Sequence, residues 1–334
     1  MAGRHPSRPA GTDRSRRRSS AVGRILALYL TEEDVEALLS PADTVDAIEA
    51  SFVRATQGSI ENRPRERLRL EEGALAVMAA ADLELGYAGV KTYAAFAHEA
   101  RFVVLLFETA RAQLAAVVEA DRLGRLRTGA ASGVAARHLA KPGATTLGVI
   151  GCGRQAETQV ACIRAALPAI DRVVAYCRTP ERLHAFCERT GALAGKSHRD
   201  SAAQEIVVTV TTSRDPVLRG EWLVPGALVC AVGANVLRAR ELDNVVLERA
   251  AFVCCDSLEQ ARRESGDLVE PIAGGVLDWL EVHELQEVVG GDLPGRQSED
   301  DIVVFKSNGI AAWDVAAGAA VLQRALQQGV GKEL

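Results

Sequence analysis

The chain has 334 residues, a formal net charge of −5 and 48% hydrophobic residues, with only 4% aromatic. This length allows two domains, and the prevalence of small aliphatic residues is typical of an α/β enzyme. The negative net charge gives no basic face for nucleic acid, and no apolar run reaches the length of a membrane span. We therefore expect a cytoplasmic protein that binds a small molecule and neither nucleic acid nor membrane.

The seven cysteines and six histidines show no metal-binding pattern. The sequence contains no CxxC pair and no HExxH motif, and most of the cysteines fall inside apolar segments. These features predict core thiols in a reducing compartment and no metal site.

The first 21 residues are rich in Arg, Ser, Pro and Gly, with a basic run at 14–18. This composition predicts a disordered tail over residues 1–21, and an anion-binding arm is the alternative. Arg24 interrupts the apolar stretch that a secretion signal would need.

The segment 22–142 is predicted to begin with one strand and two helices, at 25–30, 32–39 and 41–56. Thr31 to Asp34 match a capping box, and Ser40 followed by Pro41 marks the second helix start. Short runs separated by polar or glycine-bearing turns then predict a mostly antiparallel sheet, with strands at 65–70, 74–79, 89–93, 102–107 and 115–119. A helix crowded with Ala and Gly at 125–139 can pack closely against a neighbour.

Residues 145–156 are typical of a buried strand that turns tightly at glycines and opens a helix. Gly151 permits the turn, Gly153 lets the backbone approach a pyrophosphate, and Ala156 occupies the third-glycine position, where only a small residue fits. The first N–H groups of the helix, up to Gln155, would face the phosphates. The pattern predicts a dinucleotide site.

The second strand of this unit, at 172–176, ends without the Asp or Glu that usually binds the ribose 2′-OH of NAD. Arg178 stands there instead and can pair with a 2′-phosphate, to which Thr179 adds a hydroxyl and Arg154 adds charge. We therefore predict NADP as the cofactor, with NAD as the alternative. The competing interpretation of Arg178 is a solvated loop residue.

The Rossmann-type domain is predicted over 143–307, with further strands at 206–211, 227–231, 252–255 and 302–305. Residues 191–205 are mostly small and polar, so the crossover helix there should be short or irregular. A last helix at 311–328 predicts that residues 308–334 return to the first domain.

Several motifs in one order resemble the ornithine cyclodeaminase/mu-crystallin family over about residues 24–331. The matching segments are 89–93 (GVKTY), 119–124 (EADRLG), 126–132 (LRTGAAS), 149–156 (VIGCGRQA) and 305–309 (FKSNG). The resemblance implies an α/β protein with a Rossmann-type dinucleotide-binding domain beside a mostly antiparallel α+β substrate and dimerisation domain. It also implies a homodimer built through the first domain's sheet and an interdomain active site that interconverts amino and imino acids. Thr128, Thr211 and Ser307 are further candidates for cofactor contact.

Hydride transfer at a carbon that bears nitrogen needs a cationic clamp for the substrate carboxylate and a group that handles a proton. By motif position, the family's carboxylate-binding residues fall on Arg65, Lys91 and Arg127, with Arg67 as an alternative to Arg65. Lys91 is also the candidate catalytic residue for proton transfer. Each of these cations could instead be a solvated strand or helix end.

Cyclodeaminating family members resemble this chain at residues 231–235 but place an Asp where Asn235 stands. An amide cannot accept the proton that this carboxylate would take, although Asn235 can orient a substrate nitrogen or the nicotinamide carboxamide. The alternative is a turn-forming Asn after the preceding strand. Asp243, eight residues further on, is expected to cap the next element.

Together these features predict an NADP-linked oxidoreductase acting on the C–N bond of a small α-imino or α-amino acid, of the ketimine reductase or alanine dehydrogenase type. Two alternatives stay open: a redox-neutral, ammonia-releasing ornithine-type cyclodeaminase, and an NADP-binding protein with little turnover. The substrate's side chain is not predicted, because one sequence does not show which residues of the first domain point inward.

Overall fold

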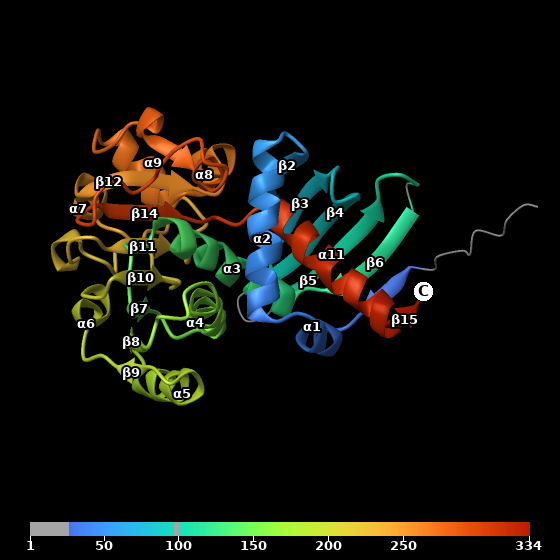
Figure 1. Ribbon diagram of the computed structural model, residues 1–334, viewed down its shortest axis with the longest axis horizontal. Coiled ribbons are helices and arrows are strands. Elements are labelled where there is room, and N and C mark those ends of the chain that lie inside the picture. The colour runs from blue at the N-terminus through green and yellow to red at the C-terminus, as the bar shows by residue number, and fades with distance from the viewer. Residues whose placement is uncertain (1–26, 97–99, 112) are drawn as a thin grey trace, which may run out of the picture.

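The computed structural model describes residues 27–96, 100–111 and 113–334, so the predicted tail lies outside the described residues. The chain forms two sheets, and helix α3 (Asp121–Leu139) lies between them and contacts both (Figure 1). This arrangement confirms the predicted α/β class with a Rossmann-type sheet beside a mostly antiparallel one. No helix within the described ranges is long and apolar enough to cross a bilayer.

The first sheet has seven strands in the order β15-β1-β6-β5-β4-β3-β2. Its strands β2 to β6 pair antiparallel with their neighbours, whereas β1 runs parallel to β6. The bounds are β1 (Leu28–Leu30), β2 (Ile60–Arg69), β3 (Gly73–Asp82), β4 (Tyr87–Phe96), β5 (Ala100–Glu108), β6 (Gln113–Glu119) and β15 (Lys332–Glu333). Several strands extend beyond the apolar runs that predicted them, because polar side chains continue the alternation on the solvent side.

Three helices accompany this sheet: α1 (Glu32–Leu38), α2 (Pro41–Thr56) and α11 (Ala311–Gln328). The predicted caps are present, since Thr31 and Asp34 form a capping box and the Ser40 side chain accepts from the Asp43 N–H. Helix α11 lies across one face of the sheet, and α2 packs on α11, where Phe52 and Trp313 meet edge to face at 5.4 Å (Figure 1). The C-terminal helix thus packs on the first sheet.

The second sheet has eight parallel strands in the order β13-β12-β14-β11-β10-β7-β8-β9. The bounds are β7 (Thr146–Ile150), β8 (Arg172–Tyr176), β9 (Leu193–Ala194), β10 (Ile206–Thr209), β11 (Leu228–Ala231), β12 (Ala250–Cys255), β13 (Val282–Glu284) and β14 (Ile302–Lys306). The strand order reverses between β7 and β10, and ligands of such sheets bind at the carboxyl ends of the strands beside that point.

Seven helices cover the second sheet: α4 (Arg154–Ala166), α5 (Pro180–Thr190), α6 (His198–Ala202), α7 (Asn244–Glu248), α8 (Leu258–Glu264), α9 (Gly266–Ala273) and α10 (Leu285–Val289). The prediction of a short crossover within 191–205 is confirmed, because α6 has only five residues. Asp243 caps α7 by accepting from the Val246 N–H at 3.1 Å, as expected. The small residues of α3 allow close packing on α4, since a Cβ on Gly129 would lie 2.4 Å from the Thr158 carbonyl oxygen.

Candidate active site

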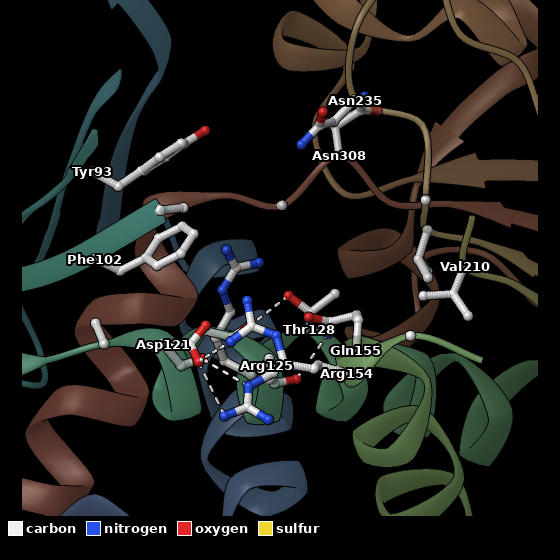
Figure 2. A pocket seen from close by; sticks show the side chains of 18 of the residues that line it. Tyr93, Phe102, Asp121, Arg125, Thr128, Arg154, Gln155, Val210, Asn235 and Asn308 are labelled. Atoms are coloured by element: carbon white, nitrogen blue, oxygen red, sulfur yellow. Dashed lines mark hydrogen bonds and ion pairs between the residues drawn. The ribbon is translucent and has the colours of Figure 1, made fainter. Parts of the chain in front are cut away.

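A cavity of about 450 Å³ opens between the two sheets and is lined from both. Tyr93 and Phe102 form its wall on the side of the first sheet, and Val210, Asn235 and Asn308 lie opposite, on the second-sheet side (Figure 2). The glycine turn at 153–155 forms another part of the lining. The cavity therefore lies where the family resemblance implies an interdomain active site.

Lys91 and Arg127, which both line this cavity, converge on one buried carboxylate. Asp314 Oδ1 accepts from Lys91 Nζ at 2.8 Å and from Arg127 Nε at 3.1 Å. All three side chains are at most 7% exposed. Burial, and then the charge of Arg127, lower the pKa of Lys91 to about 8, although Asp314 acts in the opposite direction. Lys91 therefore loses its proton at a lower pH than a solvated lysine does.

Arg65 and Arg67 converge on a second carboxylate, Glu264 of α8. Arg65 Nη1 and Arg67 Nη1 each donate to one oxygen of Glu264. Arg65 lies within the cavity lining and is 7% exposed. Glu264 offsets part of the charge of these arginines, and the contact joins strand β2 to α8. Each of the two pairs of cations therefore shares a single carboxylate.

Some buried polar atoms around the cavity lack a hydrogen-bond partner among the described residues. They include Arg127 Nη1, Arg65 Nε and Asp314 Oδ2. A guanidinium nitrogen left unpaired in a buried position is costly unless a ligand completes it. The free donors of the two arginines, together with Lys91, fit a substrate carboxylate.

The glycine turn fits a dinucleotide. Gly151 adopts φ 110°, and a Cβ there would lie 2.5 Å from the Val210 carbonyl oxygen, so the turn itself requires glycine. A Cβ on Gly153 would meet no atom within 4 Å. The space beside Gly153 is therefore open, and the first N–H groups of α4 receive no side-chain cap. Open space beside uncapped N–H groups is what a pyrophosphate needs.

The side chains next to this turn are held by α3. Arg154 pairs with Asp121 at 3.2 Å, and Gln155 Nε2 donates to the Arg125 carbonyl oxygen at 3.0 Å (Figure 2). Ala156 is fully buried, in keeping with its predicted role as the small third position. Arg154 and Gln155 line the cavity where the turn meets it.

A second pocket of about 200 Å³ continues from the glycine turn along the end of β8. Arg178 and Thr179 line it, together with Arg182 and His198, which the sequence analysis did not select. Within the described part of the chain, no Asp or Glu lines this pocket. Burial, and then the charge of Arg178, lower the pKa of His198. His198 is the first residue of the short helix α6, and no local sequence pattern predicts that this helix places it beside the second pocket.

The remaining candidates for cofactor contact differ in whether they line the main cavity. Thr128 and Thr211 line the main cavity, but the N–H and hydroxyl of Thr211 donate to the buried Glu241 at 2.6 and 2.8 Å. Ser307 is buried, and its hydroxyl donates to Asp256 at 3.1 Å. It is Asn308 and Gly309, the next two residues, that line the cavity.

The carboxylates that organise the site were missed by the sequence analysis. Asp314, Glu264 and Glu241 each stand in a separate segment, and Glu241 also accepts the Gly233 N–H at 2.7 Å. These carboxylates are separated in sequence by 8 to 223 positions from the residues that donate hydrogen bonds to them. Only the fold reveals these contacts.

Comparison with known proteins agrees with this architecture. The model of the ornithine cyclodeaminase/mu-crystallin family matches residues 27–329. Alanine dehydrogenase of Archaeoglobus fulgidus is 33% identical over 319 residues, which cover 92% of this chain and 98% of that protein.

Two solved structures have the same fold. Thermococcus litoralis Delta(1)-pyrroline-2-carboxylate reductase, in complex with NADH and L-proline, has a TM-score of 0.87 at 28% identity and covers 92% of this chain and 100% of its own. A probable ornithine cyclodeaminase from Bordetella pertussis has a TM-score of 0.85 at 33% identity and covers 91% of this chain and 99% of its own. The chain described here belongs to the ornithine cyclodeaminase/mu-crystallin family.

Proposed function

We propose that the protein is an NADP-linked oxidoreductase that reduces a small α-imino acid, or oxidises the corresponding α-amino acid, at its C–N bond. The observation that carries this proposal is the buried Lys91–Asp314–Arg127 cluster with a free guanidinium nitrogen. Its two cations line a cavity that ends at the glycine turn. The relatives named above as alanine dehydrogenase and Delta(1)-pyrroline-2-carboxylate reductase support this class of chemistry.

In this proposal, Arg127 and Lys91 bind the substrate carboxylate, and Arg65 closes the same side of the cavity. Lys91 also holds or supplies a proton near the substrate nitrogen, because its lowered pKa lets it exchange a proton close to neutral pH. The bound dinucleotide supplies or accepts hydride at the substrate carbon. The glycine turn and the first turn of α4 would hold its phosphates, and Tyr93 and Phe102 limit access of water.

We assign NADP rather than NAD on the basis of the second pocket. Arg178, Arg182 and His198 line a space to which none of the described residues contributes a carboxylate, which favours a 2′-phosphate over a free 2′-hydroxyl. The T. litoralis reductase was solved with NADH, and the Kd values of NADPH and NADH for this chain test the assignment.

Asn235 favours the reductase over the cyclodeaminase. It lines the cavity, but an amide cannot take a proton from a substrate amine. The similarity to a probable ornithine cyclodeaminase keeps redox-neutral release of ammonia as the second candidate.

We further propose a cytoplasmic homodimer. The face of the first sheet that α11 leaves uncovered carries apolar side chains that are only partly buried, among them Leu75, Val77, Val90, Leu105 and Phe107. An exposed apolar face of this kind marks a protein–protein interface. All seven cysteines are described and free, in keeping with a reducing compartment.

The decisive experiment follows NADPH oxidation with pyruvate plus ammonium and with cyclic ketimines. In the first reaction, the keto acid and ammonium lose water to give the imine, which takes hydride from NADPH and one proton to give alanine. Consumption of NADPH supports the proposal. Tight NADPH binding without turnover would instead favour a binding protein, and conversion of L-ornithine to proline and ammonia without net redox change would favour the cyclodeaminase.

A further inference from the structure

Asn308 has an unsatisfied side chain in the wall of the main cavity. The residue is 5% exposed, and neither its amide oxygen nor its amide nitrogen has a hydrogen-bond partner among the described residues. Figure 2 shows it with Asn235 on the side of the cavity opposite Tyr93 and Phe102. A buried amide that pairs with nothing carries a desolvation penalty, which a ligand that pairs with both atoms would relieve.

The backbone of Asn308, in contrast, is fully engaged. Its N–H and that of Gly309 donate to Asp256 Oδ2 at 2.7 and 2.5 Å. Its carbonyl oxygen accepts from Arg65 Nη2 at 3.0 Å. These contacts hold the backbone of Asn308 in place, so that only its side-chain amide is left to pair with a ligand.

The contacts of this segment place the amide in the substrate part of the cavity. Arg65 holds the Asn308 carbonyl, and a Cβ on Gly309 would lie 2.6 Å from Arg127 Nη1. That nitrogen is the free donor assigned above to the substrate carboxylate. Asn308 thus directly precedes Gly309, which lies against the guanidinium that would hold the substrate carboxylate. In the same network, Arg67 Nη2 donates to the carbonyl oxygen of Asn235 at 3.0 Å.

We infer that Asn308 is a specificity-determining residue that binds a neutral polar group on the side chain of the substrate, one that both donates and accepts a hydrogen bond. A hydroxyl or a carboxamide meets this requirement, whereas an alkyl side chain leaves both amide atoms unpaired. This inference rests on the proposed function and narrows its substrate to hydroxylated or amide-bearing α-imino acids.

The test compares two substrates that differ by a hydroxyl in place of a methyl group, 3-hydroxypyruvate and 2-oxobutyrate, each with ammonium and NADPH. The wild-type protein should show a kcat/KM at least about tenfold higher for 3-hydroxypyruvate. Asn308→Leu, which keeps the side-chain size, should abolish or reverse this preference while the Kd for NADPH stays unchanged. Thr92→Val, on strand β4 outside the cavity lining, serves as the matched control and should leave the preference intact.

A binding measurement separates this inference from the proposed function. Calorimetry of the protein–NADP⁺ complex with L-serine and with L-2-aminobutyrate needs no turnover, and L-serine should bind about tenfold more tightly. Selective binding without NADPH oxidation would support the role of Asn308 and refute the oxidoreductase. Turnover or binding with no preference for the hydroxyl would overturn the inference. A loss of NADPH affinity in Asn308→Leu with an unchanged substrate preference would also overturn it, because the amide would then serve the nicotinamide carboxamide.

Discussion

Lys91 and Asp314 form a buried ion pair, 2.8 Å between Nζ and Oδ1, that joins strand β4 to helix α11 across 223 residues of sequence. The same oxygen also accepts from Arg127, so one carboxylate serves two cations. Asp314 therefore orients both groups while leaving the cluster with excess positive charge. A substrate carboxylate would restore the balance, which explains how the cluster can be both rigid and ready for an anion.

Replacing Lys91 with methionine removes a carboxylate ligand and the proposed proton donor. We expect the variant to lose turnover by about 100-fold or more, because general acid catalysis typically contributes that much. The Kd for NADPH, measured by fluorescence titration, should change little, since Lys91 lies on the first sheet, away from the glycine turn. Steady-state rates equal to those of the wild type would show that Lys91 plays no part in the reaction.

The lowered pKa of Lys91 predicts a pH dependence. If the protonated lysine acts in imine reduction, kcat/KM should fall as the pH rises through about 8. Asp314→Asn removes the carboxylate that raises the pKa of Lys91, so its profile should shift to lower pH. Asp43→Asn, at the start of α2 and outside the cavity lining, is the matched control and should leave the profile in place. A profile that Asp314→Asn does not move would contradict the assignment to Lys91.

Cofactor choice depends on Arg178. Arg178→Asp should weaken NADPH binding by about 2–3 kcal/mol and NADH binding much less, because it removes a charge-assisted pair and adds repulsion toward the 2′-phosphate. Arg199→Asp makes the same charge change on α6, outside the pocket lining, and should leave both Kd values unchanged. Equal affinity of the unmutated protein for the two cofactors would rule out the NADP assignment.

Much of the fold was predictable because burial leaves a local pattern. The apolar runs of β7, β8, β10 and β14 predicted a parallel sheet, and the glycine turn between β7 and α4 identified the dinucleotide unit. The start of α3 was placed four residues too late, at Arg125 instead of Asp121. Its N-cap residue makes no side-chain bond, and Glu32 caps it instead by accepting the N–H groups of Asp121 and Arg122 at 2.6 and 2.7 Å. No local signal can reveal a cap supplied from a distant helix.

The candidate site was predictable for cations and glycines but not for their partners. Lys91 and Arg127 stand in recognisable motifs, whereas the carboxylates that hold them and their neighbours come from helices far away in sequence. Arg65 and Arg67 are two residues apart on β2, so both side chains can reach Glu264. The sequence pattern could not show that Glu264 already pairs with both arginines.

The proposed dimer depends on the open face of the first sheet. Val90→Lys puts a charge at the centre of that face, so the protein should sediment as a monomer of 35.5 kDa. Folding should persist, because the side chain remains partly exposed in the monomer. Leu280→Lys adds the same charge at a residue that is 87% exposed near β13, and it should leave the dimer intact. A wild-type protein that sediments as a monomer at micromolar concentration would refute the proposal.

The choice between the two enzyme classes depends on Asn235. The unmutated protein, given L-ornithine and catalytic NAD⁺ or NADP⁺, should release no appreciable ammonia or proline, because its cavity carries an amide where a proton-accepting carboxylate would be needed. Asn235→Asp restores that group, and we expect it to raise ammonia release above background while lowering NADPH oxidation with an imine substrate. Asn235→Ser, which removes the amide without supplying a base, controls for changes in cavity shape. Robust conversion of ornithine to proline by the unmutated protein, followed by ammonia assay and product chromatography, would mean that another group takes the proton, and the cyclodeaminase would then replace the reductase as the function of this chain.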